Sequence, residues 1–200
     1  MTQLALPLAY VAASGEADFF VSDANADAVA FLARWPDWPG PQALLIGSPG
    51  SGKSHLAGLF AARHAATLIE NADAADPEAL FHAWNAASAA RPLLMTARTR
   101  PADWPHRLPD LASRLAATPL VAIREPDDAL LAAVLAKQFA DRGLRLGPDV
   151  AAYLALRVER SFAAIAAVVA SLDAAALAGA RAVTVPLARA VLEAQGDLEI

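Results

Sequence analysis

The chain of 200 residues contains no cysteine, and methionine and tyrosine occur only twice each. Without cysteine it has no disulfide and no thiolate zinc site, which agrees with a reducing compartment. No lysine or arginine precedes Arg34, and Pro7 interrupts the first apolar stretch. That stretch therefore lacks the basic region of a secretory signal. The four histidines show no spacing with carboxylates that predicts a metal site.

Basic residues are also scarce, because 16 Lys and Arg face 21 Asp and Glu, for a net charge of −5. Such a chain has no global positive field to attract nucleic acid. The apolar run from Phe162 to Ala170 is too short to span a bilayer, and Arg160 and Asp173 flank it. We therefore expect a soluble cytoplasmic protein with no membrane partner.

One of only two lysines lies in the octet 47–54, GSPGSGKS, which matches the phosphate-loop pattern GxxxxGK[ST]. An apolar run precedes it at 43–46, and residues 55–63 have helical spacing. That strand–loop–helix context is what confirms such a match. Glycines let successive N–H groups point at phosphate oxygens, Lys53 reaches the outer phosphates, and Ser54 can ligate Mg²⁺. The residues predicted to contact a nucleotide here are Gly47, Pro49, Gly50, Ser51, Gly52, Lys53, Ser54 and His55.

Strands and helices alternate over the first part of the chain, which predicts a parallel α/β sheet. A helix that Ser22 or Asp23 caps precedes a proline-rich loop at 35–41. The expected strands are 43–46, 66–70, 92–96 and 119–123. One expected helix follows the phosphate loop and ends near 65, and two more cover 77–90 and 108–115.

After Glu125 the pattern becomes all helical. Helices are expected to open at Asp127 or Asp128, Pro148, Ser161 and Thr184, with stops at Gly143, Gly179 and Gly196. The predicted organisation is an amino-terminal segment (1–18), a P-loop α/β domain (19–125) and a small all-α lid bundle (126–200).

Several further segments, in order along nearly the whole chain, resemble the DnaA-related AAA+ proteins, and specifically the Hda family of initiator regulators. Residues 3–8 look like the family's clamp-binding hexapeptide. Residues 68–73 lie where a Walker B segment belongs, and residues 96–101 resemble sensor 1. Residues 108–115 are very similar to the arginine-finger segment, and Arg160 matches the sensor 2 arginine.

The resemblance implies a role for each of these segments. Arg114 would be the catalytic finger, Thr96 the sensor 1 residue and Arg160 a further nucleotide contact. With Ser54, Glu70 would hold Mg²⁺. The clamp-docking residues would be Gln3, Leu4, Leu6, Pro7 and Leu8.

Each assignment has a simpler alternative that the sequence leaves open. Arg114 can be a solvated helix arginine, and Thr96 can merely cap the end of a strand. Arg160 can belong to a surface ion pair, since Glu159 and Arg157 are close in the sequence. The hexapeptide can be a tail with a few apolar residues.

The chain also departs from the family pattern. Asn71 stands where a second Walker B acid would orient the attacking water, and an amide cannot act as a base. Only the thirteen residues 55–67 separate Ser54 from Leu68, where AAA+ proteins usually fit another strand and helix. We expect a missing edge strand or, alternatively, a missing Walker B strand, and impaired intrinsic hydrolysis in either case.

The resemblance implies a regulator that binds ADP or ATP with Mg²⁺ and docks on the DNA polymerase III sliding clamp, the beta subunit. It would promote hydrolysis of ATP on the initiator DnaA, prevent over-initiation, and reach DNA at the nucleoid or replisome only through the clamp. We expect no helix-turn-helix DNA-binding domain of the kind that the initiator carries after Ile200.

Two alternatives remain. One is an autonomous P-loop ATPase or kinase, against which Asn71 counts. The other is a DNA-binding adaptor that would use Arg98, Arg100 and Arg107.

Overall fold

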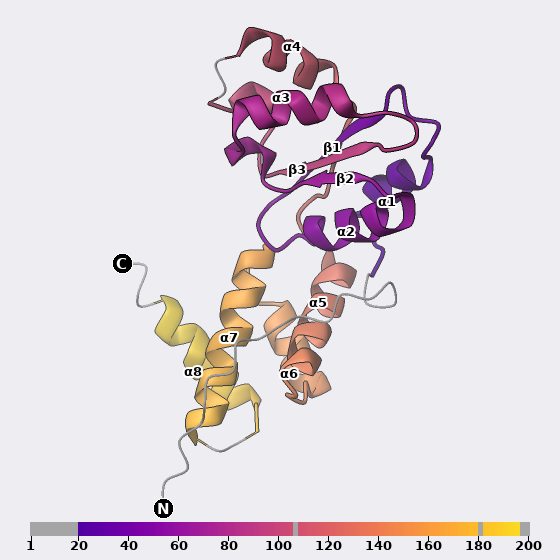
Figure 1. Ribbon diagram of the computed structural model, residues 1–200. Coiled ribbons are helices and arrows are strands. Elements are labelled where there is room, and N and C mark those ends of the chain that lie inside the picture. Colours follow the sequence, from indigo (N-terminus) through magenta and orange to yellow (C-terminus); the bar gives the residue numbers. More distant parts are fainter. Residues whose placement is uncertain (1–19, 106–107, 180–181, 197–200) are drawn as a thin grey trace, which may run out of the picture. The chain divides into compact units, whose positions relative to one another are not determined.

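A computed structural model describes residues 20–105, 108–179 and 182–196 (Figure 1). The described residues fall into two compact units, which divide between Glu125 and Pro126. The first unit holds the sheet and the phosphate loop, and the second unit is entirely helical.

The first unit is built on a sheet of four parallel strands in the order β2-β3-β1-β4. β1 occupies an interior position, where Leu44 lies in register with Met95 on one side and Leu120 on the other. Sheets covered on both faces use near-continuous apolar strands, and the sequences of β1 and β3 are of this kind. The strands are β1 Gln42–Ile46, β2 Thr67–Ile69, β3 Leu93–Ala97 and β4 Leu120–Ala122.

Helices cover both faces of this sheet, as Figure 1 shows. Side chains alternate along a strand, so Leu45 packs with α1 and α2 while Leu44 packs with α3 and α4. The helices are α1 Ala26–Ala33, α2 Lys53–His64, α3 Pro77–Ala86 and α4 Pro109–Ala117, with short 3₁₀ turns η2 Ala72–Ala74 and η3 Pro101–Asp103.

The expected shortened sheet is confirmed, because the described residues contribute four strands and all are parallel. β2 lies at the margin beside β3 and leads directly into Glu70 and Asn71. The backbone N–H of Asn71 donates to Oγ1 of Thr96, 3.3 Å away on β3. The Walker B-like segment thus lies beside the sensor 1 segment, which favours a missing margin strand over a missing Walker B strand.

The second unit is a four-helix bundle with its own apolar core. Asp127 caps α5, accepting from the N–H of Leu130 at 2.7 Å, and Ser161 caps α7 through the N–H of Ala164 at 3.1 Å. The bundle comprises α5 Asp128–Asp141, α6 Pro148–Ala155, α7 Phe162–Gly179 and α8 Val185–Gly196. Its fully buried members include Leu131, Phe139, Leu154, Ile165, Val169, Leu172 and Ala188.

Two expected helix boundaries are wrong. α1 begins at Ala26 with Asn25 in the cap position, because the hydroxyl of Ser22 is taken up in a local turn with the N–H of Ala24. α3 ends at Ala86 and not at residue 90, since Ser88 and Arg91 exchange backbone hydrogen bonds in a tight turn. Alanine-rich sequence favours helix, but here the turn prevails.

The apolar run expected to end at Ala170 belongs to a helix that continues to Gly179. Among the described residues, α7 is the one helix with the length and composition of a membrane span, with mean hydropathy 1.9. A core helix of a bundle has the same character, so the observation is weak evidence for a membrane. The buried side chains of α7, such as Ile165 and Leu172, pack into the bundle core, and Asp173 lies 3.9 Å from Arg142, which follows the last residue of α5.

Candidate nucleotide-binding site

The phosphate loop connects the carboxyl end of β1 to the first residue of α2. Gly50 and Gly52 have φ angles of 79° and 85°, in the left-handed region that residues with a side chain rarely adopt. Gly47 is required for space, since a Cβ atom there would lie 2.9 Å from Oγ of Ser51 and 3.0 Å from the carbonyl of Ile123. The glycines of the motif are therefore dictated by the path of the backbone.

The amino end of α2 opens toward this loop. The N-cap residue is Gly52, which has no side chain to cap the first-turn N–H groups. Such groups find partners in water or a ligand when no side chain supplies one. Together with the helix dipole, they form a site suited to phosphate oxygens.

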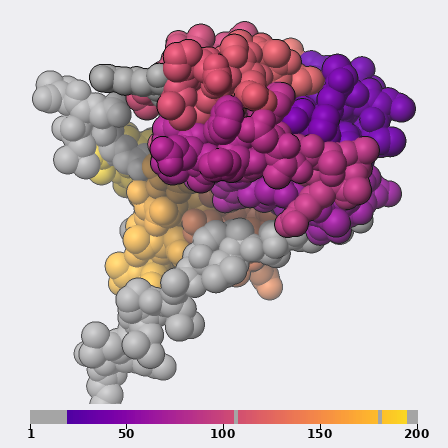
Figure 2. All heavy atoms as spheres, turned by 45° about the horizontal axis from the view of Figure 1, so that its top comes forward, coloured from indigo at the N-terminus to yellow at the C-terminus, as the bar shows by residue number. Residues whose placement is uncertain are grey.

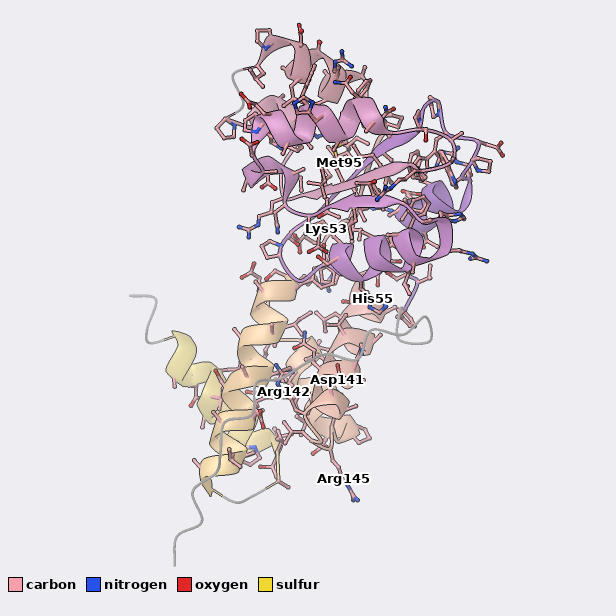
Figure 3. All side chains as sticks on the ribbon, in the orientation of Figure 1. Lys53, His55, Met95, Asp141, Arg142 and Arg145 are labelled. Atoms are coloured by element: carbon pink, nitrogen blue, oxygen red, sulfur yellow. The ribbon has the colours of Figure 1, made fainter. Side chains whose placement is uncertain are left out.

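Lys53 begins α2 and is labelled in Figure 3. Its ammonium is buried within the loop and donates to the carbonyl of Ser48 at 2.8 Å and to Oγ of Ser51 at 3.4 Å. Burial lowers the pKa of Lys53, and the nearby charge of Arg98 lowers it further, whereas the carboxylate of Asp73 raises it. The protein thus compensates the positive charge of Lys53 only in part, and phosphate oxygens would supply the remaining negative charge.

The ends of two strands meet the start of the loop. The N–H of Gly47 donates to the carbonyl of Ala97, 3.2 Å away at the end of β3. Thr96 is buried, and its hydroxyl accepts the N–H of Asn71, so this side chain fixes the turn that follows β2. In parallel α/β sheets, ligands bind at this carboxyl edge.

Two acids near this edge differ in their surroundings. Glu70, the expected Mg²⁺ ligand, is exposed, as is Ser54. Asp73 is partly buried, its Oδ1 is shielded from solvent, and no described residue donates to that oxygen. Asp73 and Arg98 are the charged groups that act on Lys53, and the motif assigned neither of them a role.

Ser54 and the carboxylates near the phosphate loop suit a magnesium ion that is bound together with a nucleotide. Mg²⁺ keeps several waters and usually takes one or two carboxylates with the phosphates. In the part of the chain that the structure describes, no group of three His, Cys, Asp or Glu side chains can hold an ion alone. Any Mg²⁺ here would depend on the phosphates, with Ser54 and one carboxylate as protein partners.

Arg114 lies on α4, where its side chain is partly exposed and contacts α3. Its guanidinium stacks over the rings of Phe81 and Trp84, 4.9 and 4.8 Å from the ring centroids, and donates to the side-chain oxygen of Asn85. The Trp84 indole donates to Thr118, just beyond the end of α4, at 3.0 Å. Figure 2 shows the surfaces of α3 and α4 adjoining.

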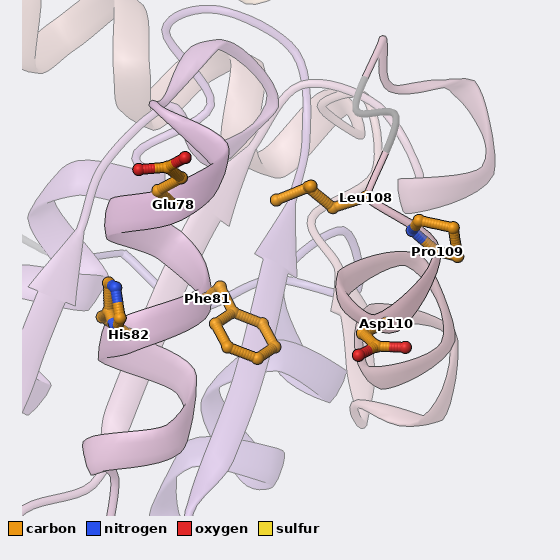
Figure 4. Close-up of a pocket in the computed structure, with 6 residues that line it drawn as sticks. All are labelled: Glu78, Phe81, His82, Leu108, Pro109 and Asp110. Atoms are coloured by element: carbon orange, nitrogen blue, oxygen red, sulfur yellow. The ribbon is translucent and has the colours of Figure 1, made fainter.

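A pocket of about 390 Å³ lies on the same side of the sheet, between α3 and the start of α4. Figure 4 shows Phe81 and Leu108 reaching toward its centre, while Glu78 and Asp110 supply acidic groups on either side. Phe81 thus contacts both the pocket and Arg114. His82 and Pro109 complete the lining.

Arg160 lies in the helical unit just before α7. Its guanidinium pairs with Asp128 at 2.8 Å, and both side chains are more than half exposed. The ion-pair alternative therefore holds in this structure, although the partner is Asp128 and not the neighbouring Glu159. Exposed pairs contribute about 0–1 kcal/mol, so this one can open at little cost.

The other predicted positions divide into two groups. His55, partly exposed, lies in the first turn of α2, and Pro49 is exposed on the phosphate loop. The predicted clamp-docking residues lie outside the described residues, as does Arg107. They are Gln3, Leu4, Leu6, Pro7 and Leu8.

Comparison with known proteins relates the helical unit to one family of lid domains and the whole chain to one fold. Residues 127–192 match the family model described as the Hda lid domain. No curated protein sequence matches the chain. Among solved structures, domain III of the Thermotoga maritima replication initiation protein DnaA matches with a TM-score of 0.73 at 15% identity, covering 88% of this chain and 94% of that domain.

Two longer proteins match over the same fold. A replication initiator DnaA bound to AMPPCP and single-stranded DNA has a TM-score of 0.58 at 17% identity, covering 77% of this chain and 62% of that protein. The Thermotoga maritima RuvB Holliday junction branch migration motor has a TM-score of 0.57 at 12% identity, covering 76% and 61%. The chain thus spans about three fifths of the length of these two.

A parallel sheet with a glycine-rich phosphate loop, followed by a helical lid, defines the fold as AAA+. Within that fold, the helical unit is similar to the lid domain of the Hda family over residues 127–192, and the whole chain has the fold of DnaA domain III.

Proposed function

We propose that this chain is a nucleotide-binding regulator of replication initiation that acts on the ATP-bound initiator DnaA. It would bind ADP or ATP with Mg²⁺ at the phosphate loop and dock on the sliding clamp through residues 3–8. It would then promote hydrolysis of the initiator's ATP with Arg114. The observation that carries the proposal is the Hda-type lid joined to a complete phosphate loop.

The phosphate loop supports nucleotide binding by its own geometry. Lys53 donates to the carbonyl of Ser48 inside the loop, and phosphate oxygens would offer it a charged acceptor instead. The carbonyl is a neutral acceptor, whereas a phosphate oxygen is anionic and adds Coulomb attraction to the ammonium in a partly buried site. The ammonium therefore gains by turning from Ser48 to the nucleotide, and the N–H groups at the start of α2 add to that gain.

Arg114 supports action on a second protein. Its contacts with Phe81 and Trp84 are worth about 0.5–1 kcal/mol each at an exposed site. An arginine finger supplied in trans accelerates hydrolysis by about 10³–10⁵-fold, which corresponds to roughly 4–7 kcal/mol of transition-state stabilisation. Exchanging the two rings for a developing phosphoryl charge is therefore favourable, and the rings hold the side chain ready at the surface of α4.

Steady-state ATP turnover tests the proposal against its rivals. The isolated protein should hydrolyse ATP slowly or not at all, because Asn71 cannot accept a proton from water. Adding clamp, DNA and ATP-bound initiator should produce turnover that depends on all components. Rapid turnover by the isolated protein would instead establish the autonomous ATPase or kinase.

A direct DNA-binding role has less support. The net charge is −5, and within the described residues Arg98 is one of the charged groups that act on Lys53. Tight DNA binding without the clamp would favour the adaptor alternative.

A further inference from the structure

Asp73 presents a feature that the sequence motif does not explain. Its Oδ1 is buried, and no hydrogen-bond donor among the described residues reaches it. Buried carboxylate oxygens are costly without a partner, and each such group calls for a functional or ligand-based reason. Glu70, three residues earlier, is exposed to solvent.

The chain after β2 carries Asp73 to the edge of the sheet where the phosphate loop begins. Asn71 adopts a left-handed conformation with φ of 51°, and its N–H is fixed by Thr96. This turn leads into η2, where Ala72 is fully buried in a cluster with Ile46 and Ala97, the last residues of β1 and β3. Asp73 follows Ala72, so its position is set by packing and not by a mobile loop.

The electrostatics agree with this placement. Asp73 and Arg98 are the charged side chains that act on the ammonium of Lys53. The negative charge of Asp73 is thus felt at the ammonium that belongs to the phosphates.

We propose that Asp73, and not Glu70, is the carboxylate that holds the hydrated Mg²⁺ ion of the bound nucleotide. This inference rests on the proposed nucleotide-binding function and specifies one residue of that site. Mg²⁺ dehydrates reluctantly and accepts carboxylates through its waters as well as directly. A carboxylate anchored beside the phosphate loop suits that chemistry.

The proposal gives Asp73 an effect on nucleotide binding whose sign depends on the metal. Without Mg²⁺ the carboxylate repels the phosphates, and with Mg²⁺ it attracts the ion that bridges them. A residue that only supports the fold would change affinity in the same direction under both conditions. This difference makes the role measurable without any hydrolysis.

The experiment measures the Kd of ADP by calorimetry on the full chain, once with MgCl₂ and once with EDTA. The proteins are the parent, Asp73→Asn and the matched control Glu70→Gln. Each substitution removes one charge and keeps the shape of the side chain. In the parent, Mg²⁺ should tighten ADP binding.

In Asp73→Asn, the ratio of the ADP Kd in EDTA to the ADP Kd in MgCl₂ should be about tenfold smaller than in the parent. Tenfold is the lower end of the effect of removing a group that supports a bound metal. In EDTA, this variant should bind ADP at least as tightly as the parent. Glu70→Gln should keep the parental response to Mg²⁺. Circular dichroism should show both variants folded.

Three results would overturn the assignment: a parental response to Mg²⁺ in Asp73→Asn, loss of that response in Glu70→Gln alone, or weaker ADP binding by Asp73→Asn in both buffers. Failure of the proposed function looks different. In that case the parent would bind no ADP with or without Mg²⁺, and this proposal would fail with it.

Discussion

The guanidinium of Arg114 on α4 lies 4.8 Å from the ring centroid of Trp84 on α3. Phe81 and Asn85 contact the same guanidinium, so the arginine links two helices as well as facing the surface. A residue expected to act on a neighbouring protein therefore also contributes to the packing of its own domain. The two roles separate experimentally, because one affects stability and the other affects hydrolysis.

Arg114→Ala should destabilise the sheet domain moderately. Losing two cation–π contacts at a partly exposed site costs about 1–2 kcal/mol in the free energy of unfolding. Urea denaturation measures this difference directly. Arg145→Ala, which removes an exposed arginine from the helical unit, provides the control and should leave the urea midpoint unchanged. An unchanged midpoint for Arg114→Ala would show that the stacking contributes nothing.

Lys53→Ala should weaken both ADP and ATP binding. Loss of a charge-assisted hydrogen bond costs about 1.5–3 kcal/mol, or about ten- to a hundredfold in Kd. Calorimetry on parent and variant gives the ratio. The other lysine of the chain, Lys137, pairs with Asp141 in the lid, so Lys137→Ala is the matched control with unchanged affinity. Equal binding by Lys53→Ala and the parent would remove the phosphate loop from the account.

Nucleotide affinity should fall in the alkaline range. The protonated ammonium is the form that binds phosphate, and the pKa of Lys53 lies below its ordinary value of 10.5 because of burial and Arg98. As pH rises through that lowered pKa, binding must take up a proton, and Kd increases. Titrating ADP from neutral pH up to 10.5 measures the profile. Lys53→Arg, whose guanidinium stays charged, should give a flat profile if it binds; a flat parental profile would contradict the expectation.

Clamp docking should depend on the first eight residues and not on the folded units. An extended peptide that presents Gln3 and the apolar Leu4, Leu6 and Leu8 suits a shallow apolar pocket, and proline lowers its ordering entropy. Deleting residues 1–8 should abolish co-elution with the clamp while the melting temperature stays nearly the same. Continued co-elution of the shortened protein would place the docking site elsewhere.

The phosphate loop could be predicted from sequence because the backbone conformation of the loop requires its glycines. Gly50 and Gly52 need positive φ, and Gly47 needs space, so the motif and the conformation imply one another. The caps of the lid helices are equally local, as Asp127 and Ser161 demonstrate. Apart from the approach of Ile123 to Gly47, these features depend on neighbours within four residues.

Other parts of the site depend on contacts between distant segments. Asp73 is held near the end of the sheet where the loop begins because Asn71 takes a left-handed turn and Ala72 packs against two strand ends. The one sequence signal was an asparagine, which tolerates that turn, two residues before an acid. The contacts of Arg114 with α3 span about thirty positions and left no signal in the motif. Asp173 similarly suggested that the apolar run stops early, although it lies beside Arg142 within the bundle.

The central claim is that Arg114 acts on ATP held by the initiator. The direct measurement is single-turnover hydrolysis of initiator-bound ATP on clamp-loaded DNA, at saturating parent or Arg114→Ala, at a temperature where the variant is folded. The account predicts that the variant binds ADP normally yet loses most of the stimulation, within the range of about 10³–10⁵-fold for a finger in trans. Undiminished stimulation by folded Arg114→Ala would contradict the trans-finger mechanism.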